Sequence, residues 1–403
     1  MRKEQTMKTL RMLLALLLCV TMLSGLCVPV SAEETELDKL ISETANALSS
    51  VNGQPGTVLA DMDVVTPGSS VSDWIAITLA RCNVPESYSQ YLDALQKYVE
   101  ARYAEDGGLH DVKATEYHRI SLVVLSLGGD PTNFGTKPDG TPIDLIADGT
   151  YNFGEKELGL QGLNGWIWAL IVLDASGVEV PEDARYSRQD MIDAIINAQN
   201  DDGSLALDKG TGDLDIPAMA LQALSPYVGR YDREITNALN WLSLEMSDNC
   251  TFFYGTSESS ESLSQVIMAV TALNWGVGDM VGFVRDGQTM YTALNRFRCK
   301  DGLYKHQQED EKPDYLATVQ ALQALLSIRG QQNGSGYVFA YQGSIFPPQS
   351  DNTFVPGGNQ TGTEKAVSEN QNTNTWLWIG LAAEVVVIAA IVVVVLKRRK
   401  KHG

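Results

Sequence analysis

The stretch DLDIPAMALQALSPY (Asp213–Tyr227) decides the fold, because similar stretches recur along the chain. The other members of the set are SDWIAITLA, EYHRISLVVLSLGG, NGWIWALIVLDASG, SLSQVIMAVTALNWG and DYLATVQALQALLSI. When they are aligned on Leu79, Leu125, Leu173, Leu224, Leu273 and Leu325, the intervals run from 46 to 52 residues. Each stretch has a polar start and an apolar body, which predicts a repeated, largely buried helix.

A second, more polar helix is expected after each stretch except the last. In YSQYLDALQKYVEARY (88–103) the apolar residues Tyr91, Leu95 and Val99 recur every four residues, which is typical of a helix with one buried face. Most units then reach an Asp-Gly turn. We therefore expect inner helix, outer helix and turn to form one unit, with the early segment ELDKLISETANAL (36–48) packing beside the sixth inner helix.

The predicted fold class is all-α, an (α/α)6 toroid of about six helical-hairpin repeats. The six units fit a closed ring better than an open solenoid, because neither end unit has the polar cap that a solenoid needs. The inner helices of such a ring surround a central space, and their amino-terminal ends meet at one mouth. The repeats are expected to start near residues 70, 114, 162, 211, 259 and 311.

Both ends of the chain carry membrane signals. Lys3, Lys8 and Arg11 precede an apolar run that ends in Val-Ser-Ala, which predicts a secretory signal peptide. Near the other end, Trp376–Leu396 is long enough to cross a bilayer, and the basic run KRRKK follows it. The expected divisions are signal peptide 1–32, toroid domain 33–342, disordered tether 343–375, transmembrane helix 376–396 and cytoplasmic tail 397–403. The body is expected outside the cell, on a single-pass anchor.

Charge and cysteine content exclude several functions. The chain has a net charge of −20, which disfavours nucleic acid as a partner. Beyond the signal peptide only Cys82, Cys250 and Cys299 remain, so at most one disulfide could form, and the sequence does not say which. The four histidines stand in no metal-binding pattern, and we expect neither a metal nor a required cofactor.

The motifs also carry a resemblance. The repeats resemble the α/α toroid superfamily of protein prenyltransferase β subunits, squalene cyclases and the cobalamin carriers transcobalamin and intrinsic factor. DPTNFG, DLIADGTYNFG, NGWIWALIVLD and DLDIPAMALQALSPY are most similar to bacterial surface proteins with prenyltransferase/squalene-oxidase repeats, many of them similar to the carriers. This resemblance implies a toroid with a corrinoid, such as cobalamin, or another hydrophobic molecule as its ligand. No stretch of this sequence resembles the carriers' second, smaller domain, so the partners expected are a small molecule and either a transporter or a second clamping chain.

The candidate ligand-binding residues lie at the predicted starts of the inner helices. The polar starts on this alignment are Ser70, Glu116, Asn164, Asp215 and Ser264, nine residues before each leucine, and Leu316 occupies the sixth place. Polar groups around an apolar shaft suit a ligand site. The residues expected to bind the ligand are Glu116, Tyr117, Asn164, Trp166, Asp213, Asp215, Gln265 and Tyr315. The competing role is helix capping, which we expect to be the main role of Asp215.

Two alternatives remain open. Asp213-Leu214-Asp215-Ile216 resembles the DxDD motif of squalene cyclases, in which an aspartate protonates an alkene, and would make Asp215 with Asp213 the acid of a terpene cyclase or prenyltransferase-like enzyme. Ile216 replaces the last aspartate, which weakens that hypothesis. Aromatic side chains that line a cyclase cavity have candidates in Trp74, Trp166 and Trp168. The other alternative is an interaction scaffold, which exposed aromatic residues on one rim would favour.

Overall fold

The architecture was obtained from a computed structural model, which describes residues 35–208, 210 and 212–341. This part of the chain is mostly helical, as expected. The predicted signal peptide, the tether and Trp376–Leu396 lie outside the described residues. Among the residues that are described, no helix is both long and apolar enough to cross a membrane.

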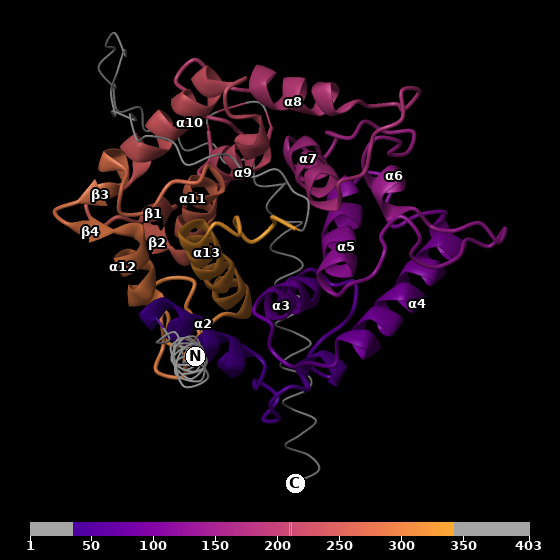
Figure 1. Cartoon of the computed structure of the whole chain (residues 1–403), viewed down its shortest axis with the longest axis horizontal. Helices are drawn as coiled ribbons and strands as arrows, with labels where there is room; N and C mark the ends of the chain where they lie inside the picture. Colours follow the sequence, from indigo (N-terminus) through magenta and orange to yellow (C-terminus); the bar gives the residue numbers. More distant parts are fainter. Residues whose placement is uncertain (1–34, 209, 211, 342–403) are drawn as a thin grey trace, which may run out of the picture. The chain divides into compact units, whose positions relative to one another are not determined.

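The apolar stretches form the inner helices of a ring (Figure 1). They are α3 (Ser70–Arg81), α5 (Ala114–Ser126), α7 (Asn164–Ser176), α9 (Asp215–Leu224), α11 (Ser260–Ala272) and α13 (Tyr315–Asn333). Each packs on the next in chain order, and α13 packs back on α3. The circuit of helices is therefore closed. The expected start is met at Ser70, Asn164 and Asp215, whereas Glu116 and Ser264 lie inside their helices.

Outer elements cover the inner helices from outside the ring. The elements are α4 (Tyr88–Asp106), α6 (Leu145–Gly149), α8 (Arg188–Asn197), α10 (Asp232–Glu245), α12 (Met290–Leu294) and α2 (Glu36–Leu48). The expectation of a full outer helix in every unit is wrong for the second and fifth units, because α6 and α12 have only five residues each. In the second unit, the glycine-rich loop after α5 replaces most of the outer helix.

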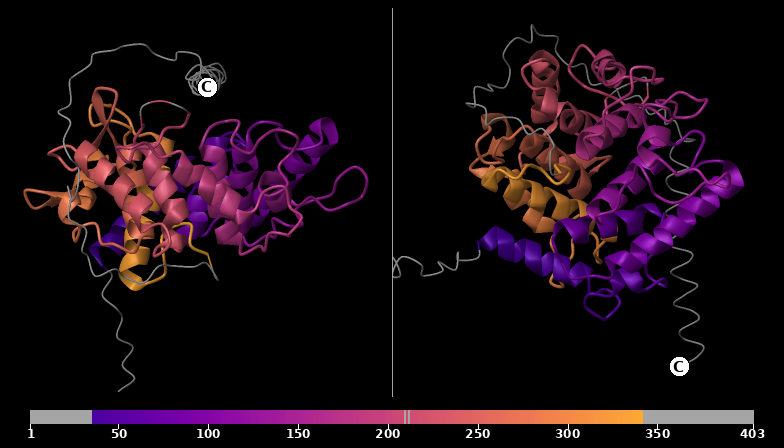
Figure 2. Two further views of the ribbon diagram at one scale, coloured as in Figure 1. Left: turned by 90° about the horizontal axis from the view of Figure 1, so that it is seen from above. Right: turned by 45° about the vertical axis from the view of Figure 1, so that its right-hand side comes forward.

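The amino-terminal helix closes the outer layer. The apolar face of α2 buries Leu37, Ile41 and Leu48, and the helix packs on α13. Figures 1 and 2 show α2, in indigo, beside the orange α13. The prediction that this segment packs on the sixth inner helix is confirmed. It supplies the outer helix that the last unit lacks.

Short elements fill the remaining connections. Two antiparallel hairpins are present, β1 (Phe252–Tyr254) with β2 (Ser257–Ser259) and β3 (Val284–Arg285) with β4 (Gln288–Thr289). Single turns of 3-10 helix are η1 (Val58–Ala60), η2 (Ser225–Tyr227), η3 (Val281–Phe283) and η4 (Asn295–Phe297). The first hairpin leads directly into α11 and so fixes the start of that helix. Cys82, Cys250 and Cys299 are all free thiols, so the one disulfide that the sequence left open does not form among these residues.

Candidate functional site inside the helical ring

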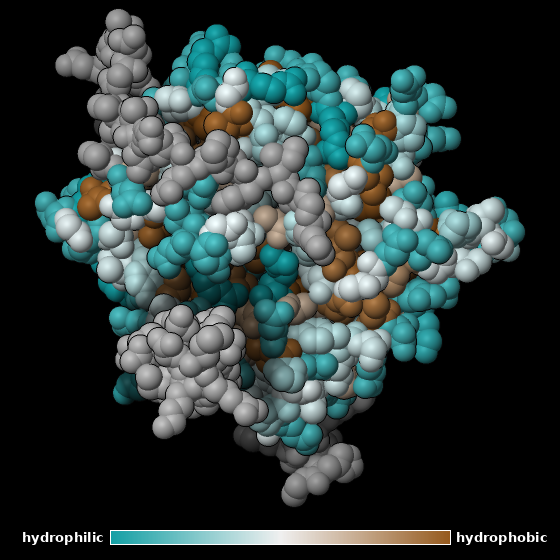
Figure 3. All heavy atoms as spheres, in the orientation of Figure 1, coloured by the Kyte–Doolittle hydropathy of each residue, from teal (hydrophilic) through white to brown (hydrophobic). Residues whose placement is uncertain are grey.

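Two tryptophans meet inside the ring. Trp74 of α3 and Trp168 of α7 lie with ring centroids 5.5 Å apart. Because α5 separates these helices in the circuit, their side chains can meet only on the inner side. Both indoles are half-buried, so each keeps part of its surface open. Figure 3 shows hydrophobic atoms gathered near the middle of one face, over α5 and α7. This aromatic pair can pack against the apolar part of a ligand.

The tryptophans identify the inner face of every inner helix. Trp74 and Trp168 each lie five residues before the leucine on which their repeats are aligned, and Met219 lies five residues before the leucine of α9. Residues four apart lie on one helix face. Asn164 therefore lies one turn before Trp168 on the inner face of α7, and Asp215 lies one turn before Met219 on that of α9. Because α7 packs on α9, these two polar side chains stand at neighbouring places on the mouth.

Three buried oxygen atoms on these two helices have no hydrogen-bond partner in the protein. They are Oδ1 of Asn164, Oδ1 of Asp215 and Oε1 of Gln222. Gln222 is seven residues after Asp215 and shares its helix face. Buried polar atoms are nearly always paired, and each exception calls for an explanation such as an ion, a water molecule or a ligand. All three atoms are acceptors when Asp215 is ionised, so a molecule bound here would donate hydrogen bonds to them.

Asp213 and Asp215 have different roles. A carboxylate oxygen of Asp213 accepts a hydrogen bond from the backbone N–H of Ile216 at 2.9 Å, which caps α9. The expectation that Asp215 is mainly a cap is therefore wrong, because its exposed neighbour Asp213 occupies that position. The pKa of Asp215 is raised to about 6, mainly by burial and also by the negative charges of Asp213 and Glu261. A hydrogen bond from Ser262 partly opposes this rise.

An amide chain joins three neighbouring inner helices. Gln222 of α9 donates from Nε2 to Oε1 of Gln265 in α11 at 3.0 Å, and Gln265 donates to Oε1 of Gln320 in α13, also at 3.0 Å. Gln265 and Gln320 are half-buried. The chain fixes the orientation of each amide, so the partnerless oxygen of Gln222 is held in place. Gln265 was expected from the sequence, whereas Gln222 and Gln320 were not.

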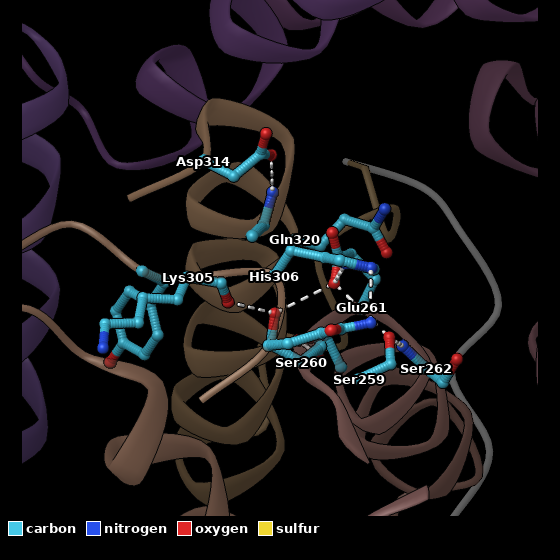
Figure 4. Close-up of polar contacts among 12 residues, drawn as sticks. Ser259, Ser260, Glu261, Ser262, Lys305, His306, Asp314 and Gln320 are labelled. Atoms are coloured by element: carbon cyan, nitrogen blue, oxygen red, sulfur yellow. Dashed lines mark hydrogen bonds and ion pairs between the residues drawn. The ribbon is translucent and has the colours of Figure 1, made fainter. Parts of the chain in front are cut away.

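Glu261 and His306 form a polar pair at the start of α11, shown with its neighbours in Figure 4. Oε2 of Glu261 lies 2.8 Å from Nδ1 of His306 and accepts a hydrogen bond from Ser260 Oγ at 3.0 Å. The hydrogen bond to Glu261 raises the pKa of His306. Ser260 Oγ also lies 2.7 Å from the carbonyl oxygen of Lys305 in the loop before α13, so its single proton is shared between that carbonyl and Glu261. Among the described residues, no group of three histidine, cysteine or acidic side chains is placed to hold a metal ion.

Glu116 belongs to a buried ionic cluster. Its Oε2 lies 2.5 Å from Nη2 of Arg119, and Nε of the same guanidinium lies 2.9 Å from Oδ2 of Asp73. Asp73 also accepts hydrogen bonds from the Tyr91 hydroxyl at 2.7 Å and from the backbone N–H of Gly68 at 3.0 Å. The cluster links α3 to α5, and Arg119 pairs with both carboxylates. Glu116 therefore has a structural role in joining the two helices.

Tyr117 and Trp166 pack toward the outer elements. The Tyr117 hydroxyl accepts from the backbone N–H of Leu109, and its ring lies edge-on to Phe153. Trp166 lies edge-on to Tyr186, with ring centroids 5.1 Å apart. The tryptophan of α7 on the inner face is thus Trp168. Trp74 and Trp168 lie at the same distance before the leucine of their repeats, and this pattern could have identified Trp168 as the inward-facing tryptophan.

Exposed aromatic side chains lie at the starts of α11 and α13. Tyr315, the first residue of α13, is 39% exposed, and Phe253 and Tyr254 of β1 are 46% exposed each. Tyr254 lies edge-on to His306, with ring centroids 6.5 Å apart. This is the arrangement that the scaffold alternative anticipates, and it adds an apolar rim beside the mouth.

Comparisons with known proteins identify no family. No protein-family model matches the chain, and no curated protein matches it. Among solved structures, the chain is similar to a Candida albicans protein geranylgeranyltransferase-I complexed with GGPP, at 11% sequence identity and a TM-score of 0.43. The match covers 74% of this chain and 93% of that one. A likeness at this level does not indicate an activity, so the function has to be argued from the contacts above.

Proposed function

We propose that this chain is a membrane-anchored extracellular protein that binds a small amphipathic molecule inside its ring. The observation that carries the proposal is the set of partnerless buried acceptors on α7 and α9, within the same ring as two half-buried tryptophans. The aromatic surface would cover an apolar body. Asn164, Asp215 and Gln222 would accept hydrogen bonds from its polar groups.

The acceptor-rich lining restricts the ligand. Asp213, Asp215 and Glu261 lie close enough that the first and last raise the pKa of Asp215 by their charge. An anionic ligand would be repelled here, whereas a neutral molecule with donor groups or an organic cation would be favoured. A corrinoid such as cobalamin, rich in amide donors, is the ligand that the sequence resemblance suggests, and other hydrophobic molecules with donor groups fit the same lining. A transporter or a second clamping chain would be the protein partner.

The test is a titration of the full chain with cobalamin and cobinamide, read by corrinoid absorbance, tryptophan fluorescence and calorimetry. We expect micromolar or tighter binding that Asp215→Ala weakens at least tenfold. Asp213→Ala is the matched control, because it removes the neighbouring carboxylate and the cap but no partnerless acceptor. If neither corrinoid binds, a panel of neutral and cationic terpenoids follows. Failure of every compound to bind would contradict the proposal.

One observation favours an enzyme as the second candidate. A carboxyl group with a pKa of about 6, such as Asp215, is partly protonated near neutral pH and can act as a general acid. The cyclase-like alternative, with Asp215 as acid and Asp213 beside it, is therefore the second candidate, although a carboxyl with a raised pKa donates its proton to an alkene less readily. Incubation of the full chain with linear polyprenes and analysis of the products would decide the matter. A cyclised product that is no longer formed by Asp215→Asn would establish the enzymatic function. If the polyprene is unchanged, ligand binding remains the proposed function.

A further inference from the structure

The chain enters its own ring after the last inner helix. Figure 1 shows the segment after α13, in yellow, running across the middle of the ring. Residues Tyr337 to Ala340 are buried, and Phe339 is only 2% exposed. Its ring centroid lies 6.0 Å from that of Trp74 and 5.5 Å from that of Trp168. The segment 337–341 therefore fills the space beside the two tryptophans.

Side chains of the ring bind the main chain of this segment. Arg81, at the end of α3, donates from Nη2 to the carbonyl of Ala340 at 2.8 Å. Ser327 of α13 accepts from the backbone N–H of Val338 at 3.0 Å. Two main-chain groups are thus bound by ring side chains, while Phe339 occupies an aromatic pocket. Main-chain hydrogen bonds combined with a side-chain pocket are the usual means of peptide recognition.

The last described residue is held as well. The Tyr341 hydroxyl lies 2.6 Å from Ser126 Oγ at the end of α5, and the Arg81 guanidinium lies 4.7 Å from the centre of the Tyr341 ring. With Trp168 of α7, four inner helices contribute to the pocket. Arg81, Ser126 and Ser327 lie in the carboxyl-terminal halves of α3, α5 and α13, away from Asn164 and Asp215 at the starts of α7 and α9.

A glycine joint connects the segment to α13. Gly334 and Gly336 have φ angles of 75° and 84°, which other residues adopt only at a cost. The carbonyl of Gly336 passes so close to Gly330 that a Cβ on Gly330 would stand 1.8 Å from its oxygen. Because α13 packs on α3 independently of this segment, the ring can stay closed when the segment leaves.

We propose that the ring interior is a binding site for aromatic peptides of the pattern Tyr-Val-Phe-Ala-Tyr, and that residues 337–341 occupy it in cis. The pocket formed by Arg81, Ser126, Ser327 and the two tryptophans recognises the peptide. The joint at Gly334 and Gly336 allows the cis segment to leave, after which residues 337–341 of a second copy of this chain can enter. This site shares Trp74 and Trp168 with the small-molecule site proposed above, but it does not use the partnerless acceptors on α7 and α9, so its test is separate.

The experiment uses the full chain with Gly330→Ala, whose added methyl group collides with Gly336 and expels the cis segment. A fluorescent, end-blocked peptide of residues 337–341 is titrated and followed by anisotropy. It lacks Gly336 and so avoids the collision. We expect at least tenfold tighter binding to Gly330→Ala than to the wild type. Gln332→Ala, an exposed change two residues along α13, should behave as the wild type does.

Two further arms make the outcome decisive. Adding Trp168→Ala to Gly330→Ala should lower the affinity for the peptide at least tenfold. A scrambled peptide of the same composition should bind the Gly330→Ala chain no better than it binds the wild type. Equal binding of both peptides, or no binding by a Gly330→Ala protein that still melts cooperatively, would overturn the proposal. If Gly330→Ala does not fold, Gly334→Ala strains the joint at a φ of 75° without changing the pocket, and the same two results decide.

Discussion

Asp73 and Asp215 are two carboxylates in the first turns of inner helices, and their surroundings are opposite. Asp73 is fully buried and bound by Arg119, Tyr91 and the backbone of Gly68. Asp215 is half-buried, and one of its oxygen atoms has no partner. The comparison separates a carboxylate that holds the ring together from one left available to a ligand. It contrasts a carboxylate in a satisfied ionic cluster between α3 and α5 with a carboxylate at the start of α9 that keeps a partnerless oxygen atom.

The largest effect should come from breaking the satisfied cluster. Arg119→Ala would leave the buried Asp73 and its neighbour Glu116 without their cation, and removing one partner of a buried ion pair costs about 3–5 kcal/mol. Denaturant unfolding at pH 7 measures the loss. Arg102→Ala is the control, because its ion pair with Asp106 is exposed and such pairs contribute about 0–1 kcal/mol. Similar losses for both variants would show that the buried cluster around Arg119 does not hold α3 and α5 together.

A smaller, pH-dependent effect should come from Asp215. Its pKa of about 6 in the folded chain lies above its ordinary value of 3.8, so the folded state holds the proton more tightly. The contribution of Asp215 to the free energy of unfolding is therefore largest below about pH 4, falls as the pH rises to 6, and stays lower above it. We expect Asp215→Asn to abolish this fall, which should amount to about 1–2 kcal/mol for a half-buried group.

Thermal unfolding from pH 4 to pH 8 measures the difference between Asp215→Asn and the wild type. The difference is needed because the pKa of Asp174 is also raised to about 6, mainly by burial, so that the wild type alone would mix two titrations. Parallel curves for variant and wild type would show that the pKa of Asp215 does not differ between the folded and unfolded chain.

The smallest effect should come from the cap. Asp213→Ala removes the acceptor for the backbone N–H of Ile216, and the loss of such a cap costs about 1 kcal/mol. Asp213→Asn should recover most of the stability, since asparagine caps helices about as well as aspartate does. Urea unfolding of the two variants measures this. A loss that asparagine does not restore would mean that the charge of Asp213, and not its cap, stabilises α9.

Much of the fold follows from local patterns in the sequence. The apolar stretches predict the inner helices, because a helix that is apolar on most faces has to be covered on most faces. The amphipathic pattern of residues 36–48 correctly predicts that α2 packs on α13. The outer helices of the second and fifth units were overestimated, since a short apolar run such as Leu145–Ile146 contributes to the core in a five-residue turn as well as in a long helix.

The candidate site follows from the sequence only in part. The periodicity places Asn164, Asp215 and Gln265 at or near the starts of inner helices. It does not show which of Asp213 and Asp215 caps α9, because both stand within capping distance and the local backbone angles decide. Nor does it show that Trp168, and not Trp166, faces Trp74, because two residues along a helix point in different directions and only the ring defines an inside.

The sequence by itself determined the repeated helices, the polar starts that they present and the helix that covers the last unit. These depend on periodicity and capping, which act over a few residues. Only the tertiary structure decided that Arg119 satisfies Asp73, that an oxygen of Asp215 has no partner, and that Phe339 packs against two tryptophans. Such pairings join residues far apart in the chain, and they exist only once the ring has closed and made its interior.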